Sequence, residues 1–253
     1  MNTLKFLGTS GARFVMIKQL RASGGLWLNL EGKNIVVDPG PGSLVRALSS
    51  KPKLDPSKLD AIIITHKHLD HMGDLSVMIE AMTEGGFKKK GLLFVPGDAI
   101  ESDDPAVLKY LRGFPEEIII LKEGGKYKIG GVEFSTPIKH DHRVETYGLN
   151  FKIKEKTALS IVADTRFFNG IEKYYSGKTL VINVVRYEQD NTLDHLSIGD
   201  VKEIIAKAKP ERAIITHFGM KVLQKKPWVI AQTLTEELGI EVIAARDGME
   251  IEI

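Results

Sequence analysis

Short runs of aliphatic and β-branched residues recur along the whole chain, and Gly, Pro, Asp or Lys bounds each run. Runs of this length and composition are typical of β-strands. The predicted strands cover 3–8, 26–30, 34–38, 61–65, 91–96, 117–121, 131–136, 147–153, 158–164, 179–185, 212–216, 240–245 and 249–253. Strands that follow one another without a helix between them favour sheets packed on each other, with helices outside, over a strictly alternating parallel sheet.

Apolar residues at helical spacing predict helices between several of these strands. In segment 198–208, Val201, Ile204 and Ile205 recur at intervals of three and four, and Ser197 precedes the segment as a cap. The predicted helices cover 43–50, 73–83, 105–112, 169–175, 198–208 and 227–238. The pattern as a whole therefore indicates the α/β class.

The length and composition narrow the class of protein further. With 253 residues, the chain is expected to form one domain, residues 1–253. It has no cysteine, so any metal ligands must be His, Asp or Glu. A net charge of +2 gives no general attraction to nucleic acid or membranes. Because the first residues lack a signal-peptide pattern and no apolar run approaches about 20 residues, we expect a cytoplasmic protein without membrane contact.

Three apolar runs end in a residue that can bind a metal. "AIIITH" at 61–66 and "AIITH" at 213–217 are nearly the same phrase, and "ALSIVAD" at 158–164 ends in Asp164. Continuous apolar runs indicate strands buried on both faces. Functional groups gather at the carboxyl ends of such strands in layered α/β proteins. Either a cation or an arginine such as Arg166 would compensate a buried Asp164.

The segment "THKHLDH" at 65–71 holds four candidate ligands, His66, His68, Asp70 and His71. On an extended segment the first three would share a face, and the Asp-His pair would reach a second point beside it. A single histidine after a strand is usually solvated or hydrogen-bonded. Four such groups in six positions instead indicate a divalent metal site, because imidazole and carboxylate are common ligands of divalent metals.

This segment resembles the signature of the metallo-β-lactamase fold superfamily, and the resemblance covers nearly the whole chain. "FLGTSG" at 6–11 and "VVDPGPG" at 36–42 are similar to the opening strands and Asp-x-Gly loop of the family. "HRVETYGL" at 142–149 resembles the third-histidine motif of its ribonuclease Z-like branch, and "VADT" at 162–165 resembles the bridging-aspartate motif. "HLSIGDVKEIIAKAKPERAIITHFG" at 195–219 resembles the closing segment of that branch.

The resemblance implies a four-layer αββα sandwich and two divalent metal ions, with zinc expected and manganese or iron as alternatives. Carried over by position, the first metal would be held by His66, His68 and His142, the second by Asp70, His71 and His217, and Asp164 would bridge them. The third histidine has two candidates. Its distance from the preceding strand favours His140, whereas its spacing to "YG" favours His142, which we prefer.

The resemblance also implies a hydrolase that uses a hydroxide activated by two metals, with Asp70 and His195 as catalytic residues. His195 would serve as general acid or anion stabiliser, and Asp38 as a partner of a ligand histidine. The His-x-Ser segment at 195–197 points to a phosphodiester. Lys67, Arg143 and Arg166 are candidates to meet its phosphate. A cyclic nucleotide or another small phosphodiester is the expected substrate, and a homodimer is a reasonable expectation.

Other activities stay open at this stage. A transfer-RNA 3′-processing endonuclease is not favoured, because only 21 residues separate His142 from Asp164 and leave no room for an RNA-gripping arm. A hydrolase of a thioester, lactone or β-lactam is a second alternative, although the His-x-Ser segment argues against it. A diiron oxidoreductase or an inactive binding subunit is a third.

Overall fold

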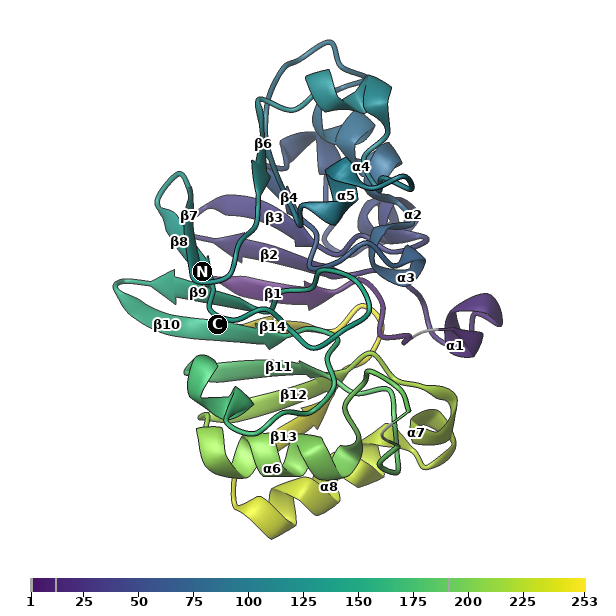
Figure 1. Ribbon diagram of the computed structural model, residues 1–253, viewed down its shortest axis with the longest axis vertical. Helices are drawn as coiled ribbons and strands as arrows, with labels where there is room; N and C mark the ends of the chain where they lie inside the picture. Colours follow the sequence, from purple (N-terminus) through teal and green to yellow (C-terminus); the bar gives the residue numbers. More distant parts are fainter. Residues whose placement is uncertain (1, 12, 191) are drawn as a thin grey trace.

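The computed structural model describes residues 2–11, 13–190 and 192–253, and its strands form two sheets of seven strands each (Figure 1). In spatial order, the first sheet contains β14 (Glu250–Glu252), β1 (Thr3–Phe6), β2 (Leu26–Leu30), β3 (Lys33–Val37), β4 (Ala61–Ile63), β5 (Leu92–Val95) and β6 (Glu117–Ile120). The second contains β13 (Glu241–Ala244), β12 (Arg212–Thr216), β11 (Thr179–Asn183), β10 (Lys156–Val162), β9 (Leu149–Ile153), β8 (Val132–Thr136) and β7 (Gly125–Ile129).

The two sheets share one internal arrangement. In the first, antiparallel pairing from β14 to β3 gives way to parallel pairing from β3 to β6. In the second, antiparallel pairing from β7 to β10 gives way to parallel pairing from β10 to β13. Within each parallel part, the carboxyl ends of the strands meet at the same edge of the sheet. Loops at these edges are therefore well placed to bring distant residues together.

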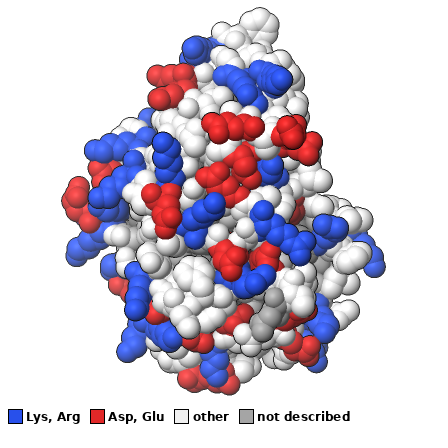
Figure 2. All heavy atoms as spheres, viewed as in Figure 1, with Lys and Arg blue, Asp and Glu red and all other residues white. Residues whose placement is uncertain are grey.

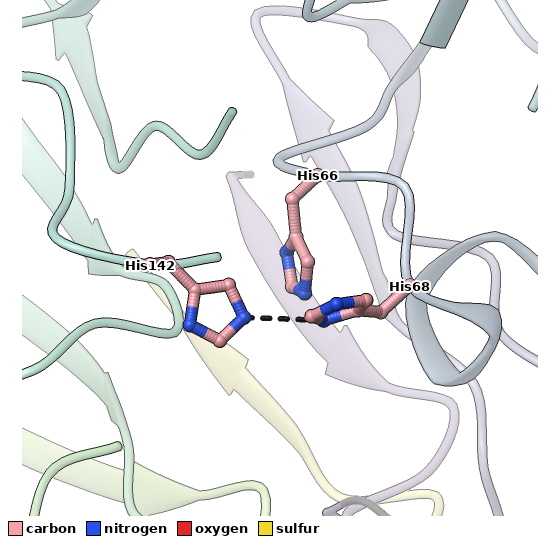
Figure 3. Close-up of side chains that lie close together, drawn as sticks. All are labelled: His66, His68 and His142. Carbon is pink, nitrogen blue, oxygen red and sulfur yellow. Dashed lines mark hydrogen bonds between the residues drawn. The ribbon is translucent and has the colours of Figure 1, made fainter. Parts of the chain in front are cut away.

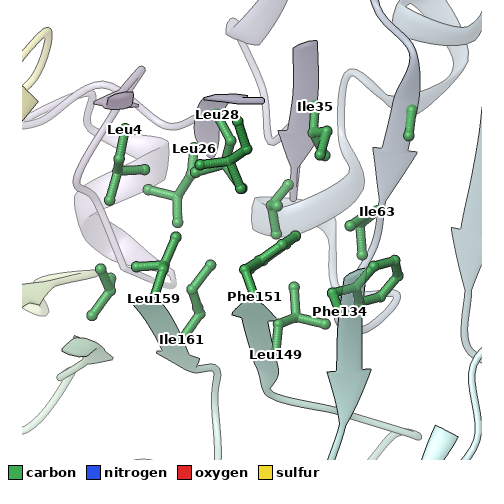
Figure 4. Packing of buried hydrophobic residues seen from close by; sticks show 14 of the residues in the cluster. Leu4, Leu26, Leu28, Ile35, Ile63, Phe134, Leu149, Phe151, Leu159 and Ile161 are labelled. Atoms are coloured by element: carbon green, nitrogen blue, oxygen red, sulfur yellow. The ribbon is translucent and has the colours of Figure 1, made fainter. Parts of the chain in front are cut away.

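A layer of apolar side chains fills the space between the two sheets (Figure 4). Leu4, Leu28 and Ile63 from the first sheet face Phe134 and Phe151 from the second, and all five are at most 2% exposed. The alternation within β1 explains this packing, because Leu4 and Phe6 enter the layer while Lys5 lies on the other face of the sheet.

Helices cover the outer face of each sheet and close two further apolar layers. The first sheet is covered by α2 (Ser43–Ser49) and α4 (Leu75–Met82), and the second by α6 (Ile198–Ala208) and α8 (Pro227–Leu238) (Figure 1). One-turn helices α1 (Phe14–Ile17), α3 (Leu69–Met72) and α5 (Asp98–Glu101), and the short α7 (Met220–Gln224), lie in the connections. The predicted αββα sandwich is confirmed.

Two predicted helices are wrong. Over 105–112 the chain forms only a 3₁₀ turn, Lys109–Gly113. The Arg112 guanidinium donates to the carbonyls of Ile100 (2.9 Å) and Val107 (3.2 Å), so a side chain satisfies backbone groups there. Over 169–175 only the 3₁₀ turn Ile171–Tyr174 forms, because Gly170 has a φ of 85°, which breaks a right-handed helix.

Strand β7 and the four short connecting helices were not predicted. The segment "GKYKI" of β7 alternates exposed and more buried positions, and two of its five residues are lysines. It pairs with β8, and the Tyr127 ring stacks on Phe134 at 5.0 Å between centroids. Elements of one turn are too short for a helical period to show in the sequence.

The surface carries both signs of charge. In Figure 2, basic and acidic side chains are interspersed over the visible face, in keeping with the net charge of +2. Within the described ranges, none of the helices has the length and apolar character needed to cross a bilayer.

Candidate metal centre

The candidate ligands meet where loops leave the carboxyl ends of strands in both sheets. His66 follows β4 of the first sheet, while Asp164 follows β10 and His217 follows β12 of the second. His142 lies in the connection between β8 and β9. Ligand-type atoms from these segments form two neighbouring groups, each with its atoms within 4.8 Å of one another.

The first group consists of His66, His68 and His142, whose rings converge from opposite sides (Figure 3). His142 Nε2 lies 3.1 Å from His68 Nδ1, and the His66 ring centroid lies 4.8 Å from that of His68. Burial lowers the pKa of His66 well below its usual value and that of His68 to about 4. Both imidazoles are therefore neutral near pH 7, which is the form that binds a metal.

The second group consists of Asp70, His71, Asp164 and His217. His217 Nε2 lies 3.3 Å from His71 Nε2, 3.2 Å from Asp164 Oδ2 and 3.4 Å from Asp70 Oδ2. Burial opposes charge on both His71 and Asp164. Neighbouring carboxylates nevertheless hold the pKa of His71 well above its usual value, and neighbouring histidines hold that of Asp164 well below its usual value.

Asp164 lies between the two groups. Its Oδ2 atom is 4.0 Å from His66 Nε2 and 3.5 Å from His71 Nε2, one histidine of each group. Its Oδ1 atom accepts a hydrogen bond of 2.9 Å from Asn183 Nδ2. Asn183 ends β11, and the sequence reasoning missed it, although the polar residue closing the apolar run "TLVIN" was a usable signal. Asn183 therefore fixes Oδ1 of Asp164, and Oδ2 faces both groups.

The side chains fit divalent cations. His66 Nε2 and Asp70 Oδ2 are buried and have no hydrogen-bond partner in the described part of the chain. The Nε2 atoms of His71 and His217 lie 3.3 Å apart, and His142 Nε2 lies 3.1 Å from His68 Nδ1. A neutral imidazole has one nitrogen with a free lone pair, which a cation between two such rings could accept. Cations between these atoms would satisfy the unpartnered acceptors and replace the proton that His71 otherwise carries.

Asp70 and His71 reach the second group because the chain turns into a helix after His68. The carbonyl of His68 accepts from the amides of His71 (2.9 Å) and Met72 (3.0 Å), which begins α3. The expectation that His66, His68 and Asp70 share one face of an extended segment is therefore wrong for Asp70. Gly40 of the "DPGPG" loop packs against this turn, since a Cβ there would lie 2.0 Å from the Asp70 carbonyl oxygen.

Asp38 contacts His71 directly and His66 through Thr65, on the side of each ring away from the candidate metal positions. Its Oδ2 atom lies 3.0 Å from His71 Nδ1 and accepts a 2.7 Å hydrogen bond from the Thr65 hydroxyl. The Thr65 oxygen in turn lies 3.1 Å from His66 Nδ1. A carboxylate behind a ligand histidine fixes its tautomer, so that Nε2 of His71 presents its lone pair to the second group. Asp38 has a φ of 52°, a left-handed conformation that Asp and Asn tolerate.

Replacing Asp38 with asparagine is expected to weaken metal binding by about 10–100-fold, because the neutral amide orients His71 less strongly. Asparagine also tolerates the left-handed backbone, so the fold should persist. Competition against a metal-binding dye would measure the affinity. The matched control is Asp60→Asn, a carboxylate bonded to Lys33 and to the amide of Asn34. Equal affinities in the two variants would contradict the role of Asp38.

The structure places His140 outside both groups. Its Nδ1 atom lies 3.2 Å from the Asp164 carbonyl, and its Nε2 atom accepts from the Tyr175 hydroxyl. Burial lowers the pKa of His140 to about 4, so the ring is neutral. Both of its nitrogens are occupied by the protein, whereas His142 Nδ1 bonds to the Asp194 carbonyl and leaves Nε2 facing His68. The geometry therefore favours His142 as the third histidine.

His195 lies at the edge of the cluster. Its ring is 5.3 Å from that of His142, and its Nδ1 atom is 3.4 Å from Asp164 Oδ2. Two residues later, Ser197 begins α6 with a capping box, in which its amide donates to Asp200 Oδ2 at 2.8 Å and its hydroxyl accepts from the Asp200 amide at 3.2 Å. The predicted cap is confirmed, and it fixes the chain next to His195.

The basic residues expected to meet phosphate all have acidic or polar partners. Arg143 and Arg166 pair with Asp194, and Lys67 donates to Ser102 at 2.9 Å. The side chains of Arg143 and Arg166 are 71% and 45% exposed, so these pairs lie at the surface. Their positive charge is therefore partly neutralised before any substrate arrives.

Comparison with known proteins gives matches along most of the chain. The family model described as the β-lactamase superfamily domain matches residues 33–218. An uncharacterized protein of Methanocaldococcus jannaschii is 30% identical over 257 aligned positions, covering 98% of this chain and 94% of that protein. A ribonuclease Z of Borreliella burgdorferi is 22% identical over 312 positions, covering 98% and 96%.

The fold has a counterpart among solved structures. The metallo-β-lactamase fold protein YhfI of Bacillus subtilis superposes with a TM-score of 0.80 at 18% identity, covering 99% of this chain and 98% of that one. The fold shared with YhfI, the two groups of candidate ligands and the matched family model all point to the same family. The chain therefore belongs to the β-lactamase superfamily and has the metallo-β-lactamase fold of metal-dependent hydrolases.

Proposed function

We propose that this metal-dependent hydrolase cleaves a small phosphodiester, such as a cyclic nucleotide, with two divalent cations, zinc being expected. His66, His68 and His142 would hold one cation, Asp70, His71 and His217 the other, and Asp164 would contact both. Bound there, the cations would activate water as a nucleophile near neutral pH and offset the negative charge that develops on the substrate. Asp70, with Oδ2 unpartnered among the described residues, would orient that water and accept its proton.

The observation that carries the phosphodiester proposal is the position of His195. It is an eighth ligand-type residue beside the seven proposed ligands, and its side chain is 18% exposed. A histidine at the edge of the cluster can give a proton to a departing alkoxide or stabilise charge on it. Alkoxides leave poorly without such help, which makes a proton donor more useful for phosphodiesters than for thioesters, whose thiolates leave readily.

A small substrate is favoured over transfer RNA. The 21 residues between His142 and Asp164 are largely used by the hairpin of β9 and β10 inside the second sheet. Aligning 98% of this 253-residue chain to the ribonuclease Z takes 312 positions, so that relative has segments this chain does not have. Transfer-RNA 3′ processing remains the second candidate, because the same relative matches along 98% of the chain.

The test is hydrolysis of bis-p-nitrophenyl phosphate with added Zn²⁺ or Mn²⁺, run beside cyclic nucleotides, a thioester, a lactone and a transfer-RNA precursor. Turnover of the phosphodiesters well above that of the thioester and lactone would support the proposal. Preference for the thioester or lactone would overturn it. Cleavage of the RNA precursor in preference to the small phosphodiesters would favour the second candidate.

His195→Ala is expected to lower kcat on the best phosphodiester by about 10²–10⁴-fold while metal content stays unchanged, because general acid catalysis contributes about that much. Steady-state kinetics and elemental analysis of the same preparation would check both parts. His142→Ala is the contrasting variant, since it should lose metal as well as activity. A fully active His195→Ala enzyme would remove the main support for the phosphodiester proposal.

A further inference from the structure

A second pocket lies on the outer face of the first sheet, near the end of α2 and the turn before β14. Its volume is about 270 Å³. It is lined by Lys5, Leu7, Arg46, Ser49, Ser50, Lys51 and Gly248. Three of these residues are cationic and two carry hydroxyl groups, while no carboxylate and none of the proposed metal ligands is among them. The pocket is thus separate from the metal centre in its residues and in its chemistry.

Lys5 supplies a buried positive charge to this pocket. It lies on β1, and its side chain is only 7% exposed. Its ammonium donates to the Lys51 carbonyl at 3.0 Å and pairs with Glu250 at 3.3 Å. Glu250 is 39% exposed, so water screens part of this attraction. A lysine is rarely buried to this extent without a compensating partner.

The pocket is lined by three cations, and among the described residues Glu250 is the one carboxylate that forms an ion pair with any of them. The Arg46 guanidinium and the Lys51 ammonium have no ion pair or hydrogen bond with another residue in the described ranges. With Lys5 they give three cations against Glu250, which leaves an excess of two positive charges. Positive charges that line one pocket repel each other, and an anion between them would relieve that repulsion.

Ser50 adds an independent sign of a missing partner. Its hydroxyl oxygen is buried, yet it has no hydrogen-bond partner within the described part of the chain. An unpartnered buried hydroxyl costs free energy that a ligand oxygen would recover. The neighbouring Ser49 hydroxyl already donates to the Val45 carbonyl at 2.8 Å, so Ser50 is the free donor.

We propose that this pocket binds the phosphate group of a small phosphorylated molecule. The planar guanidinium of Arg46 can donate to two phosphate oxygens, Lys5 and Lys51 add point charges, and Ser50 donates its hydroxyl. A water occupies about 30 Å³ in the liquid, so the pocket has room for a phosphate together with part of the group that carries it. Leu7 is the one large apolar side chain in the lining, which makes an apolar ligand a poor fit.

β1 connects the pocket with the metal centre. Lys5 and Leu7 line the pocket, and the next residues, Gly8, Thr9 and Ser10, line a cavity that also contacts Asp70 and His217. Asp247 accepts a hydrogen bond of 2.7 Å from the Thr9 hydroxyl. It precedes Gly248 of the pocket, so this bond links the lining of the pocket to the lining of the cavity at the metal centre. A phosphate in the pocket would therefore be separated from the metal centre by the end of β1 and the residues that follow it.

The proposal can be tested by titrating inorganic phosphate and ribose 5-phosphate into the zinc-loaded full chain and following backbone amide resonances. The amides of Ser49, Ser50 and Lys51 are expected to shift and saturate with a Kd of about 1 mM or lower. Tighter binding of ribose 5-phosphate would identify an organic phosphate as the ligand, and equal or tighter binding of inorganic phosphate would identify the free ion. Absence of saturation at these amides with both probes would overturn the proposal.

The variant Arg46→Gln with Lys51→Gln is expected to raise the Kd at this pocket by at least about tenfold, because it removes two charged contacts. Both side chains are exposed, so the fold should be unaffected. The matched control is Lys53→Gln, an exposed lysine nearby that does not line the pocket. An unchanged Kd in the double variant would overturn the proposal. Hydrolysis at the metal centre is a separate readout, so failure of either proposal leaves the other standing.

Discussion

Asp164→Asn is expected to abolish hydrolysis and to lower the metal content of the chain. The substitution keeps the size of the side chain and the oxygen that accepts from Asn183, but it removes the negative charge that faces both histidine groups. If Asp164 is shared by two cations as proposed, its loss should reduce kcat/KM by a factor on the order of 10³ or more, because groups that act as a unit fail together. Elemental analysis and kinetics on one preparation would measure both effects.

The matched control for Asp164→Asn is Asp141→Asn. Asp141 is also an aspartate of the second half of the chain, but its side chain is 60% exposed and its closest ion pair, to Arg166, is 4.0 Å long. We expect this control to keep its metal and its activity. An Asp164→Asn protein with the metal content and kcat/KM of the control would show that the carboxylate does not hold the metals.

Exhaustive chelation is expected to abolish activity and to lower the melting temperature by roughly 5–10 °C. Metal present at 100 times its Kd stabilises a protein by about 2.7 kcal/mol. For a chain of 150–250 residues, each kcal/mol shifts the melting temperature by about 2–4 °C. The effect should be large here because the proposed ligands join loops of two different sheets. Scanning calorimetry before and after chelation would measure it.

Readdition of Zn²⁺, Mn²⁺ or Fe²⁺ to the chelated protein would identify the metal that restores turnover. The control is Asp164→Asn, in which chelation should shift the melting temperature much less. Full activity in protein that elemental analysis shows to be free of metal would exclude the proposed chemistry. An unchanged melting temperature would exclude a metal link between the sheets.

The sequence identifies side chains that the structure brings close together, because their residue types are distinctive and their spacing is short. "THKHLDH" places four candidates within six positions, and the structure brings each of them to one of the two groups. The partners behind these ligands were harder to find. Asp38 was expected beside a ligand histidine, but which one was not predicted, and Asn183 was missed, since a single polar residue at a strand end has many ordinary explanations.

The differences from the predicted structure come from individual residues, such as the left-handed Gly170 before the turn Ile171–Tyr174 and the side chains of Arg112 and Asp194. Arg112 binds the carbonyls of Ile100 and Val107 and so prevents the helix expected over 105–112. Asp194 pairs with Arg143 and Arg166, two of the residues expected to meet phosphate, and the sequence did not predict these pairs. The Asp194 pairs join residues that are 28 and 51 positions apart, and no periodicity within a short window can reveal them.

The order in which the ligands occur along the chain has a consequence for biosynthesis. His66, His68, Asp70 and His71 are made early, but His217 follows β12, which must pair with β11 and β13 to hold it. A nascent chain with only its first sheet would present an incomplete set of ligands. Capture of the two proposed metals is therefore expected after translation has passed β13, so that the supply of metal in the cell acts on the folded chain and not on its early intermediates.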